Sequence, residues 1–196
     1  MPNDWRKLLS QKWRAIASGP FFDLAAPPAE FTSTLPNEYL AAAAEFGGRE
    51  GFLGDTYLRL YRLNELIALN VSYAVPAWLP QVVVFGSNGI GEAFAFQLGE
   101  AAVIQVPFLP LSSEYIEQKG KDFTDFLRKL ASAGESIEQN PDTVGMEIHD
   151  KHPICLGGSP TDPENKVIVP AAKHAEICSF WNKVYSRIRA QQIDKP

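Results

Sequence analysis

Residues 82–94 read VVVFGSNGIGEAF, and this run decides the fold. It begins with four residues of high strand propensity and continues into Gly86-Ser87-Asn88-Gly89, residue types that favour tight turns. After the turn, alanine alternates with phenylalanine from Ala93 to Phe96, as a strand with one buried face requires. The run predicts two strands joined by a hairpin turn with positive φ angles. A ligand-binding loop around Asn88 is the alternative interpretation.

Regular elements are expected on both sides of this hairpin. Strands are predicted at residues 56–61, 81–85, 92–98 and 102–108. Helices are predicted at residues 4–18, 63–70 and 121–133, and a further helix opens at Leu35-Pro36 and ends at Gly47-Gly48. The sequence therefore predicts an α+β fold, in which helices flank a mixed or antiparallel sheet of about four or more strands.

The composition describes a chain with an ample core and little net charge. Of its 196 residues, 45% are hydrophobic and 11% aromatic, and the formal net charge is −5. The N-terminus lacks a basic start followed by an apolar stretch, and no run approaches about 18 apolar residues. We therefore expect a cytoplasmic protein that has no membrane partner.

A nucleic-acid-binding protein normally gathers Lys and Arg on one face. Here only Lys183, Arg187 and Arg189 suggest such a ridge, and a solvated helix face is the favoured interpretation. A nucleic acid is therefore not the expected partner, although contact with one through the C-terminal segment stays open.

All histidines and cysteines of the chain fall within 30 residues near the C-terminus: His149, His152, Cys155, His174 and Cys178. Imidazole and thiolate are donors for transition metals, and imidazole titrates near neutral pH, so this window is the expected place for chemistry. Because no export signal is visible, the two cysteines are expected as reduced thiols or metal ligands rather than as a disulfide.

The N-terminal part carries four features in a fixed order. They are the helix start Leu35-Pro36-Asn37-Glu38-Tyr39, the helix end Gly47-Gly48, the run at residues 82–94, and a closing helix with Phe123, Phe126 and Leu127. In this order they resemble the SUKH superfamily, which includes the yeast Smi and Knr cell-wall regulators and many bacterial immunity proteins. The resemblance covers residues 27–131. It implies an α+β domain that binds a protein partner, in bacteria commonly a toxin delivered by a neighbouring cell.

The C-terminal part carries a second pattern. Its parts are Glu147-Ile148-His149-Asp150-Lys151-His152-Pro153, Gly157-Gly158, Asn165, and His174 with Cys178. Their spacing resembles the HNH nuclease motif in the form found in colicin-type DNases, which implies a compact ββα-metal module.

By this resemblance, His149 and His174 take ligand positions for Zn²⁺ or another divalent metal, and Cys178 stands where the family has a further ligand histidine. Glu147, Asn165 and the glycine pair Gly157-Gly158 belong to the structural motif. The alternative is that His174 packs in the core while Cys178 is a small buried apolar residue.

One position departs from the pattern, because the general-base histidine that directly follows the first ligand is Asp150 here. A carboxylate near pKa 3.9 is a weaker base than an imidazole near pKa 6.5, and it repels an approaching phosphate. His152 lies two residues further along a predicted strand, in a register that the motif does not provide. Asp150 and His152 are therefore catalytic candidates only if the chain is a nuclease. On balance the sequence favours a protein that is not an enzyme.

The two resemblances predict two units: residues 1–135, a SUKH-like domain with an N-terminal helix, and residues 136–196, an HNH-like ββα module. The first functional hypothesis is a cytoplasmic immunity or adaptor protein that neutralises a toxin by protein–protein contact and has a catalytically silent tail. The alternative is a divergent metal-dependent HNH endonuclease with a SUKH-like regulatory domain. A third hypothesis gives the histidines and cysteines a purely structural role, in a small zinc knuckle.

Overall fold

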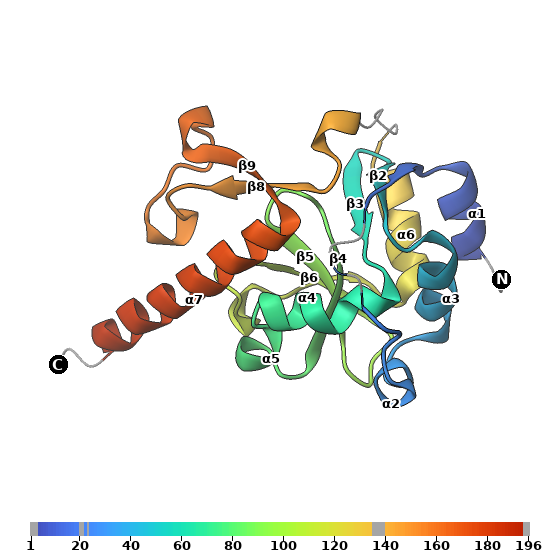
Figure 1. The fold of residues 1–196 in the computed structure, drawn as a ribbon, viewed down its shortest axis with the longest axis horizontal. Helices are drawn as coiled ribbons and strands as arrows, with labels where there is room; N and C mark the ends of the chain where they lie inside the picture. Colours follow the sequence, from blue (N-terminus) through green and yellow to red (C-terminus); the bar gives the residue numbers. More distant parts are fainter. Residues whose placement is uncertain (1–3, 20–21, 23, 135–139, 194–196) are drawn as a thin grey trace.

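The computed structural model describes residues 4–19, 22, 24–134 and 140–193. Its centre is a seven-stranded sheet in which each strand pairs with the next one along the chain, and every pairing is antiparallel (Figure 1). The strands are β1 (Arg14–Ala17), β2 (Arg49–Leu53), β3 (Thr56–Leu60), β4 (Val82–Ser87), β5 (Glu92–Gln97), β6 (Val103–Pro107) and β7 (Glu117–Gly120). The α+β prediction is confirmed, and the sheet is antiparallel rather than mixed.

The four predicted strands correspond to β3 through β6, and the hairpin between β4 and β5 forms where residues 82–94 predict it. Gly89 and Gly91 adopt φ angles of 74° and 100°. The side-chain oxygen of Asn88 accepts hydrogen bonds from the backbone N–H groups of Ile90 and Glu92, both at 3.0 Å. Asn88 therefore stabilises the turn, which is the role that the hairpin interpretation gives it.

The sequence pattern misses β1, β2 and β7. These strands are four or five residues long and contain few large apolar side chains, so they show no clear alternation. They form because a neighbouring strand offers backbone groups that need partners, which is a tertiary cause rather than a local propensity.

The N-terminal helix is shorter than the predicted residues 4–18. Helix α1 (Asp4–Gln11) ends early, and β1 then pairs along β2. The indole N–H of Trp13 donates to the Gly51 carbonyl at 3.0 Å, and Ile16 is 37% exposed instead of continuing a buried stripe. The helical spacing of these residues is therefore misleading, because pairing with β2 satisfies the backbone in an extended conformation.

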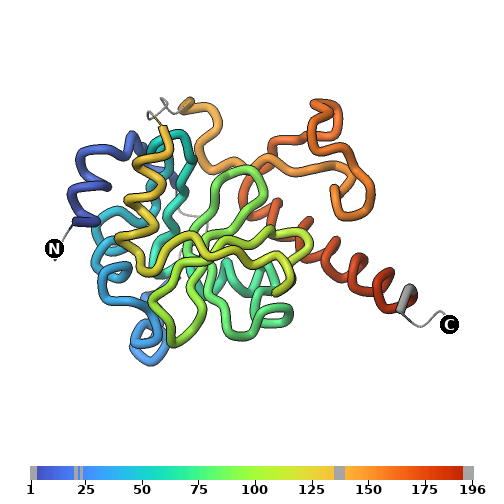
Figure 2. Tube along the Cα trace, turned by 180° about the vertical axis from the view of Figure 1, so that it is seen from behind, coloured from blue at the N-terminus to red at the C-terminus, as the bar shows by residue number. Residues whose placement is uncertain are grey.

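The remaining helices of the first part are α2 (Ala29–Thr32), α3 (Asn37–Phe46), η1 (Leu63–Glu65), α4 (Leu66–Ser72), α5 (Val75–Trp78), η2 (Ser113–Tyr115) and α6 (Phe123–Ser132). Helix α3 begins directly after Pro36 and ends at Gly47, as predicted. Figures 1 and 2 view opposite sides of the molecule and show α4 in front of the sheet in one view and α6 in front in the other. This agrees with the burial of β4 at every position, since such a strand needs cover on both faces.

Aromatic rings fill the space between α3, α6 and the sheet. The Tyr39 ring lies 5.1 Å from the rings of both Phe85 and Phe96 and 5.5 Å from that of Phe123. Burial of one such side chain stabilises the fold by about 1.5–3 kcal/mol. This cluster fixes β4 and β5, and through them the hairpin that contacts the C-terminal part.

The C-terminal part has the order strand, strand, helix. Strand β8 (Met146–Asp150) pairs antiparallel with β9 (Lys166–Pro170), and α7 (Ala171–Ile193) follows directly. Short turns η3 (Pro141–Thr143), η4 (Ile154–Leu156) and η5 (Pro163–Asn165) complete it. The Asn165 side chain accepts from the His152 N–H at 2.8 Å and donates to the carbonyls of His152 and Ser159 at 3.0 and 2.9 Å. The predicted ββα order and the turn-fixing role of Asn165 are confirmed.

The predicted boundary between residues 135 and 136 falls in residues 135–139, outside the described residues. The C-terminal half of α7 extends away from the body of the molecule (Figure 1). Within the residues that the structure describes, every helix is too short or too polar to cross a lipid bilayer.

Candidate metal centre

Strand β8 and helix α7 bring three of the five predicted donor residues together. On β8 the side chains alternate, so that Glu147 and His149 are buried while Ile148 is 38% exposed. On α7, His174 and Cys178 are four residues apart and share one helix face. We call His149, His174 and Cys178 the donor triad; one ligand atom from each lies within 4.8 Å of the other two.

The distance between two of the three donor atoms matches that in a tetrahedral metal site. The Cys178 Sγ and His174 Nε2 atoms are 3.5 Å apart. Tetrahedral Zn²⁺, with Zn–S near 2.3 Å and Zn–N near 2.05 Å, places such a pair about 3.6 Å apart. The His149 Nε2 atom is buried and has no hydrogen-bond partner. An unpaired buried nitrogen costs free energy, and a metal ligand bond would remove that cost.

Burial tunes the protonation of the donor triad. It lowers the pKa of His174 to about 3, with the nearby His149 as a second cause, and it lowers the pKa of His149 as well. Both imidazoles are therefore neutral at pH 7, which is the form that binds metals. Burial raises the pKa of the Cys178 thiol, so that metal-free protein keeps the thiol proton and a bound cation would have to displace it.

The first part of the chain supplies a wall and a hydrogen bond to this site. The hydroxyl of Tyr73, at the C-terminal end of α4, lies 2.9 Å from His174 Nδ1. The Tyr73 ring stacks on Phe108 with centroids 4.0 Å apart, and Phe108 meets the His174 ring edge-on at 5.5 Å. The sequence gives no sign of this contact, because nothing in the local pattern around Tyr73 shows that α7 packs against α4.

A cleft of about 90 Å³ lies over the donor triad. The turn at residues 90–92 and residues 107–109 line it from the side of the large sheet. A metal ion in the triad would have one open position facing a space of this size.

The two catalytic candidates from the sequence take different places relative to this cleft. Asp150 lines the cleft, but its carboxylate forms an ion pair with Lys166, its partner across the hairpin. His152 is exposed at the start of the turn that Asn165 holds, and Cys155 is a half-buried free thiol outside the triad. Gly157 has a φ of 97°, which suits its predicted place in the turn.

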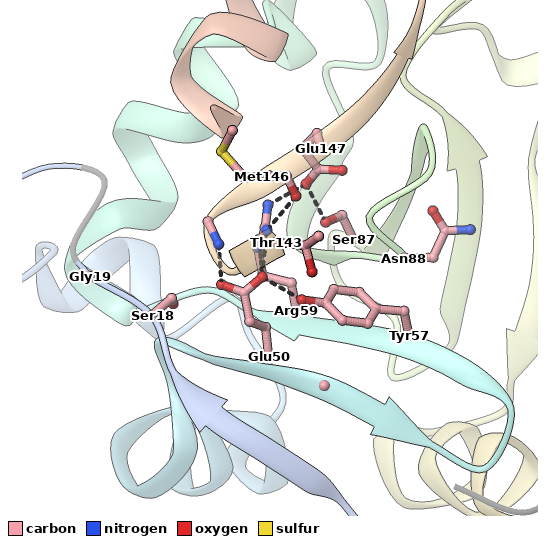
Figure 3. Close-up of polar contacts among 12 residues, drawn as sticks. Ser18, Gly19, Glu50, Tyr57, Arg59, Ser87, Asn88, Thr143, Met146 and Glu147 are labelled. Carbon is pink, nitrogen blue, oxygen red and sulfur yellow. Dashed lines mark hydrogen bonds and ion pairs between the residues drawn. The ribbon is translucent and has the colours of Figure 1, made fainter. Parts of the chain in front are cut away.

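Glu147 belongs to a buried ionic cluster that joins β8 to the large sheet (Figure 3). The Arg59 guanidinium contacts Glu50 Oε2 at 2.5 Å and Glu147 Oε1 at 2.6 Å, and it donates to the Met146 carbonyl at 2.7 Å. The hydroxyls of Ser87 and Tyr57 donate to Glu147 and Glu50 at 2.8 and 2.5 Å. Glu147, which the sequence motif assigns a structural role, is thus paired with Arg59, a residue whose local sequence gave no signal of this contact.

The charges in this cluster shift the pKa values of its members. Burial alone would lower the pKa of Arg59, but the carboxylates of Glu147 and Glu50 raise it more, so that the guanidinium stays charged. Burial raises the pKa of Glu147 against the opposing effect of Arg59. Glu50 Oε1 also accepts from the Gly145 N–H at 2.9 Å, which fixes the chain just before β8.

A second, larger cavity of about 580 Å³ also lies along β8, and it shares Ile90 and Ile148 with the cleft. We call it the junction groove, because β3, the β4–β5 turn, β8 and β9 line it. Its apolar lining consists of Phe52, Tyr57, Ile90, Met146, Ile148 and Ile168. Ile90, Ile148 and Ile168 are 64%, 38% and 53% exposed, which makes this groove an apolar patch open to solvent.

Comparison with known protein families and with curated proteins finds no match for this chain. The donor triad and the junction groove are therefore interpreted from their own residues and geometry.

Proposed function

We propose that the chain is a cytoplasmic protein of the immunity or adaptor class, which binds and neutralises a toxin, and that its HNH-like tail is catalytically silent. The observation that carries this proposal is the enclosure of the donor triad. His149, His174 and Cys178 are 6%, 1% and 1% exposed, and the cleft above them has a volume of about 90 Å³. Residues 90–92 and 107–109, which belong to the SUKH-like part, line this cleft.

A nuclease needs room for a phosphodiester with its flanking nucleotides, a base, and positive charge. A cleft of about 90 Å³ is small for such a substrate, and the Asp150 carboxylate forms an ion pair with Lys166. The ridge on α7 is also thinner than the sequence suggests, because Arg189 pairs with Glu114 at 2.7 and 2.9 Å. These three observations favour binding over catalysis.

The junction groove is the proposed contact surface for the partner. Its lining is mainly apolar, and Asp55 and Glu147 are its charged residues, so no basic side chain of the described residues lines it. We propose that it accepts an apolar segment of the toxin, because Ile90, Ile148 and Ile168 form an exposed apolar surface there.

A bound Zn²⁺ would have a structural role in this scheme. His149, His174 and Cys178 would hold it, and it would tie β8 to α7 directly behind the groove. Such an ion contributes to folding stability because the unfolded chain has no preformed site. We expect protein purified without a histidine tag to contain about one zinc per chain, and Cys178→Ser to lose it in mass-spectrometric metal analysis.

Two assays test the function. Supercoiled plasmid should stay intact with the purified protein in Mg²⁺, Ni²⁺ or Zn²⁺, and the toxin encoded beside this gene should form a tight complex with it and be inhibited. Ile168→Asp in the groove should break that complex, whereas Ile67→Asp, at a 40% exposed site on α4, should not. Nicking of the plasmid that His174→Ala abolishes would refute the silent tail, and equal binding by both isoleucine variants would refute the groove.

One observation favours the endonuclease alternative. The three donors all line the cleft, and three protein ligands with an open position are typical of catalytic zinc sites. In that case the turn at residues 90–92, which belongs to the SUKH-like part, would have to move away from the donor triad. Cleavage by the native protein that Asp150→Ala abolishes would identify the carboxylate as the base and favour this alternative.

A further inference from the structure

We infer that Tyr73 is a positioning residue for the metal centre, and that the centre is shared between the sheet domain and the C-terminal part. The inference rests on the metal-binding part of the proposed function and not on the identity of any protein partner. It concerns a side chain that lies 101 residues from His174 in sequence and 2.9 Å from its ring in space.

The first step concerns the two nitrogens of His174. Nε2 lies 3.5 Å from Cys178 Sγ and Nδ1 lies 3.9 Å from it, while the Tyr73 hydroxyl contacts Nδ1. A neutral imidazole that binds a metal through one nitrogen carries its proton on the other. The geometry therefore gives the metal to Nε2 and a donated Nδ1–H hydrogen bond to the Tyr73 oxygen.

The second step concerns orientation. Metal-binding histidines almost always hold the second ring nitrogen in a hydrogen bond, which fixes the ring and its tautomer. Here the hydroxyl is itself rigid, because the Tyr73 ring is 1% exposed and stacks on Phe108 at 4.0 Å with an interplanar angle of 20°. Removal of the hydroxyl alone would leave this stack in place.

The third step concerns the connection that results. Helix α4 belongs to the sheet domain, while His149, His174 and Cys178 belong to β8 and α7. Tyr73 can orient His174 only when α7 packs on α4. A metal ion that binds the oriented His174 therefore binds best in that arrangement. Metal binding therefore stabilises the arrangement in which α7 packs on α4, and this packing in turn raises the metal affinity by linkage.

Tyr73→Phe tests this inference, and Tyr39→Phe is the matched control, because the buried Tyr39 hydroxyl has no hydrogen-bond partner. The probe is Zn²⁺, and its affinity is measured by competition with a chromophoric chelator on the full chain. We expect the dissociation constant of Tyr73→Phe to rise about 10- to 100-fold and that of Tyr39→Phe to stay within about two-fold of the wild type. A Co²⁺-substituted absorption spectrum should also change for Tyr73→Phe alone.

A second measurement needs no variant. In long-range ¹H–¹⁵N spectra of the Zn²⁺-loaded wild-type chain, we expect His174 to be protonated on Nδ1 and metal-bound through Nε2. Binding through Nδ1, or equal Zn²⁺ affinity of Tyr73→Phe and wild type, would overturn the role of Tyr73 and leave the proposed function standing. Absence of Zn²⁺ binding by the wild type would overturn this inference together with the metal-binding part of that function.

Discussion

Replacement of Arg59 by methionine tests how the C-terminal part is attached to the sheet. Arg59 is fully buried and is the cation between Glu50 and Glu147, with N···O distances of 2.5 and 2.6 Å. Methionine keeps the unbranched shape and removes the charge, so both carboxylates lose their principal partner while they stay buried.

The magnitude follows from these contacts. At an effective dielectric constant of 20, a close ion pair contributes about 4 kcal/mol, so two pairs contribute about 8 kcal/mol before desolvation. The guanidinium no longer has to be desolvated, and the carboxylates can take up a proton, which together reduce the loss to about 3–5 kcal/mol. With an m-value of about 2 kcal/mol/M, the urea midpoint should fall by about 2 M.

The assay is urea unfolding followed by circular dichroism and tryptophan fluorescence. Arg128→Met is the matched control, because Arg128 is 53% exposed and pairs with Asp4 at the surface, where a pair contributes less than about 1 kcal/mol. The double variant Arg59→Met with Glu147→Gln should lose less unfolding free energy than the two single variants lose together, since Glu147→Gln removes one of the carboxylates that Arg59→Met leaves unpaired. If Arg59→Met costs no more than Arg128→Met, the reasoning about the buried cluster is wrong.

Three further predictions concern the core, the catalytic position and the acid response. Phe96→Ala should lower the free energy of unfolding by about 3–5 kcal/mol in thermal or urea unfolding, because the ring is fully buried. The control Phe180→Ala, at a 60% exposed site, should change it by less than about 0.5 kcal/mol. Similar losses in both variants would contradict the described core. Asp150→His should not create plasmid nicking with Mg²⁺ or Ni²⁺, since the cleft above the triad remains about 90 Å³, and nicking by this variant would show that the missing base alone silences the tail. In protein kept metal-free with a chelator, the pKa of His174 is about 3 in the folded chain and 6.5 in the unfolded chain. Below pH 6.5 the unfolded chain therefore binds more protons than the folded chain, and the free energy of unfolding falls as the pH falls toward 3. Urea midpoints at pH 7 and 5 should reveal a loss of about 2 kcal/mol from this group at pH 5, and an unchanged midpoint would contradict the burial of a neutral His174.

The order of local elements could be predicted because periodicity and turn chemistry are local properties. The hairpin at residues 82–94, the helix after Pro36 and the turn held by Asn165 all depend on neighbouring residues and form as predicted. The extent of the N-terminal helix was predicted wrongly, because the spacing of Trp13 and Ile16 is helical while the pairing partner of that segment lies in β2. A single sequence window does not contain such a partner.

The sequence by itself determined which residues can serve as donors, that His174 and Cys178 share a helix face, and that a carboxylate stands at position 150. Only the tertiary structure decided that residues of the large sheet line the cleft at the triad, that the Tyr73 hydroxyl contacts His174, and that Arg59 pairs with Glu147. The physical reason is that these contacts join residues 88 to 101 positions apart, and their free energy comes from mutual burial, which no local propensity encodes.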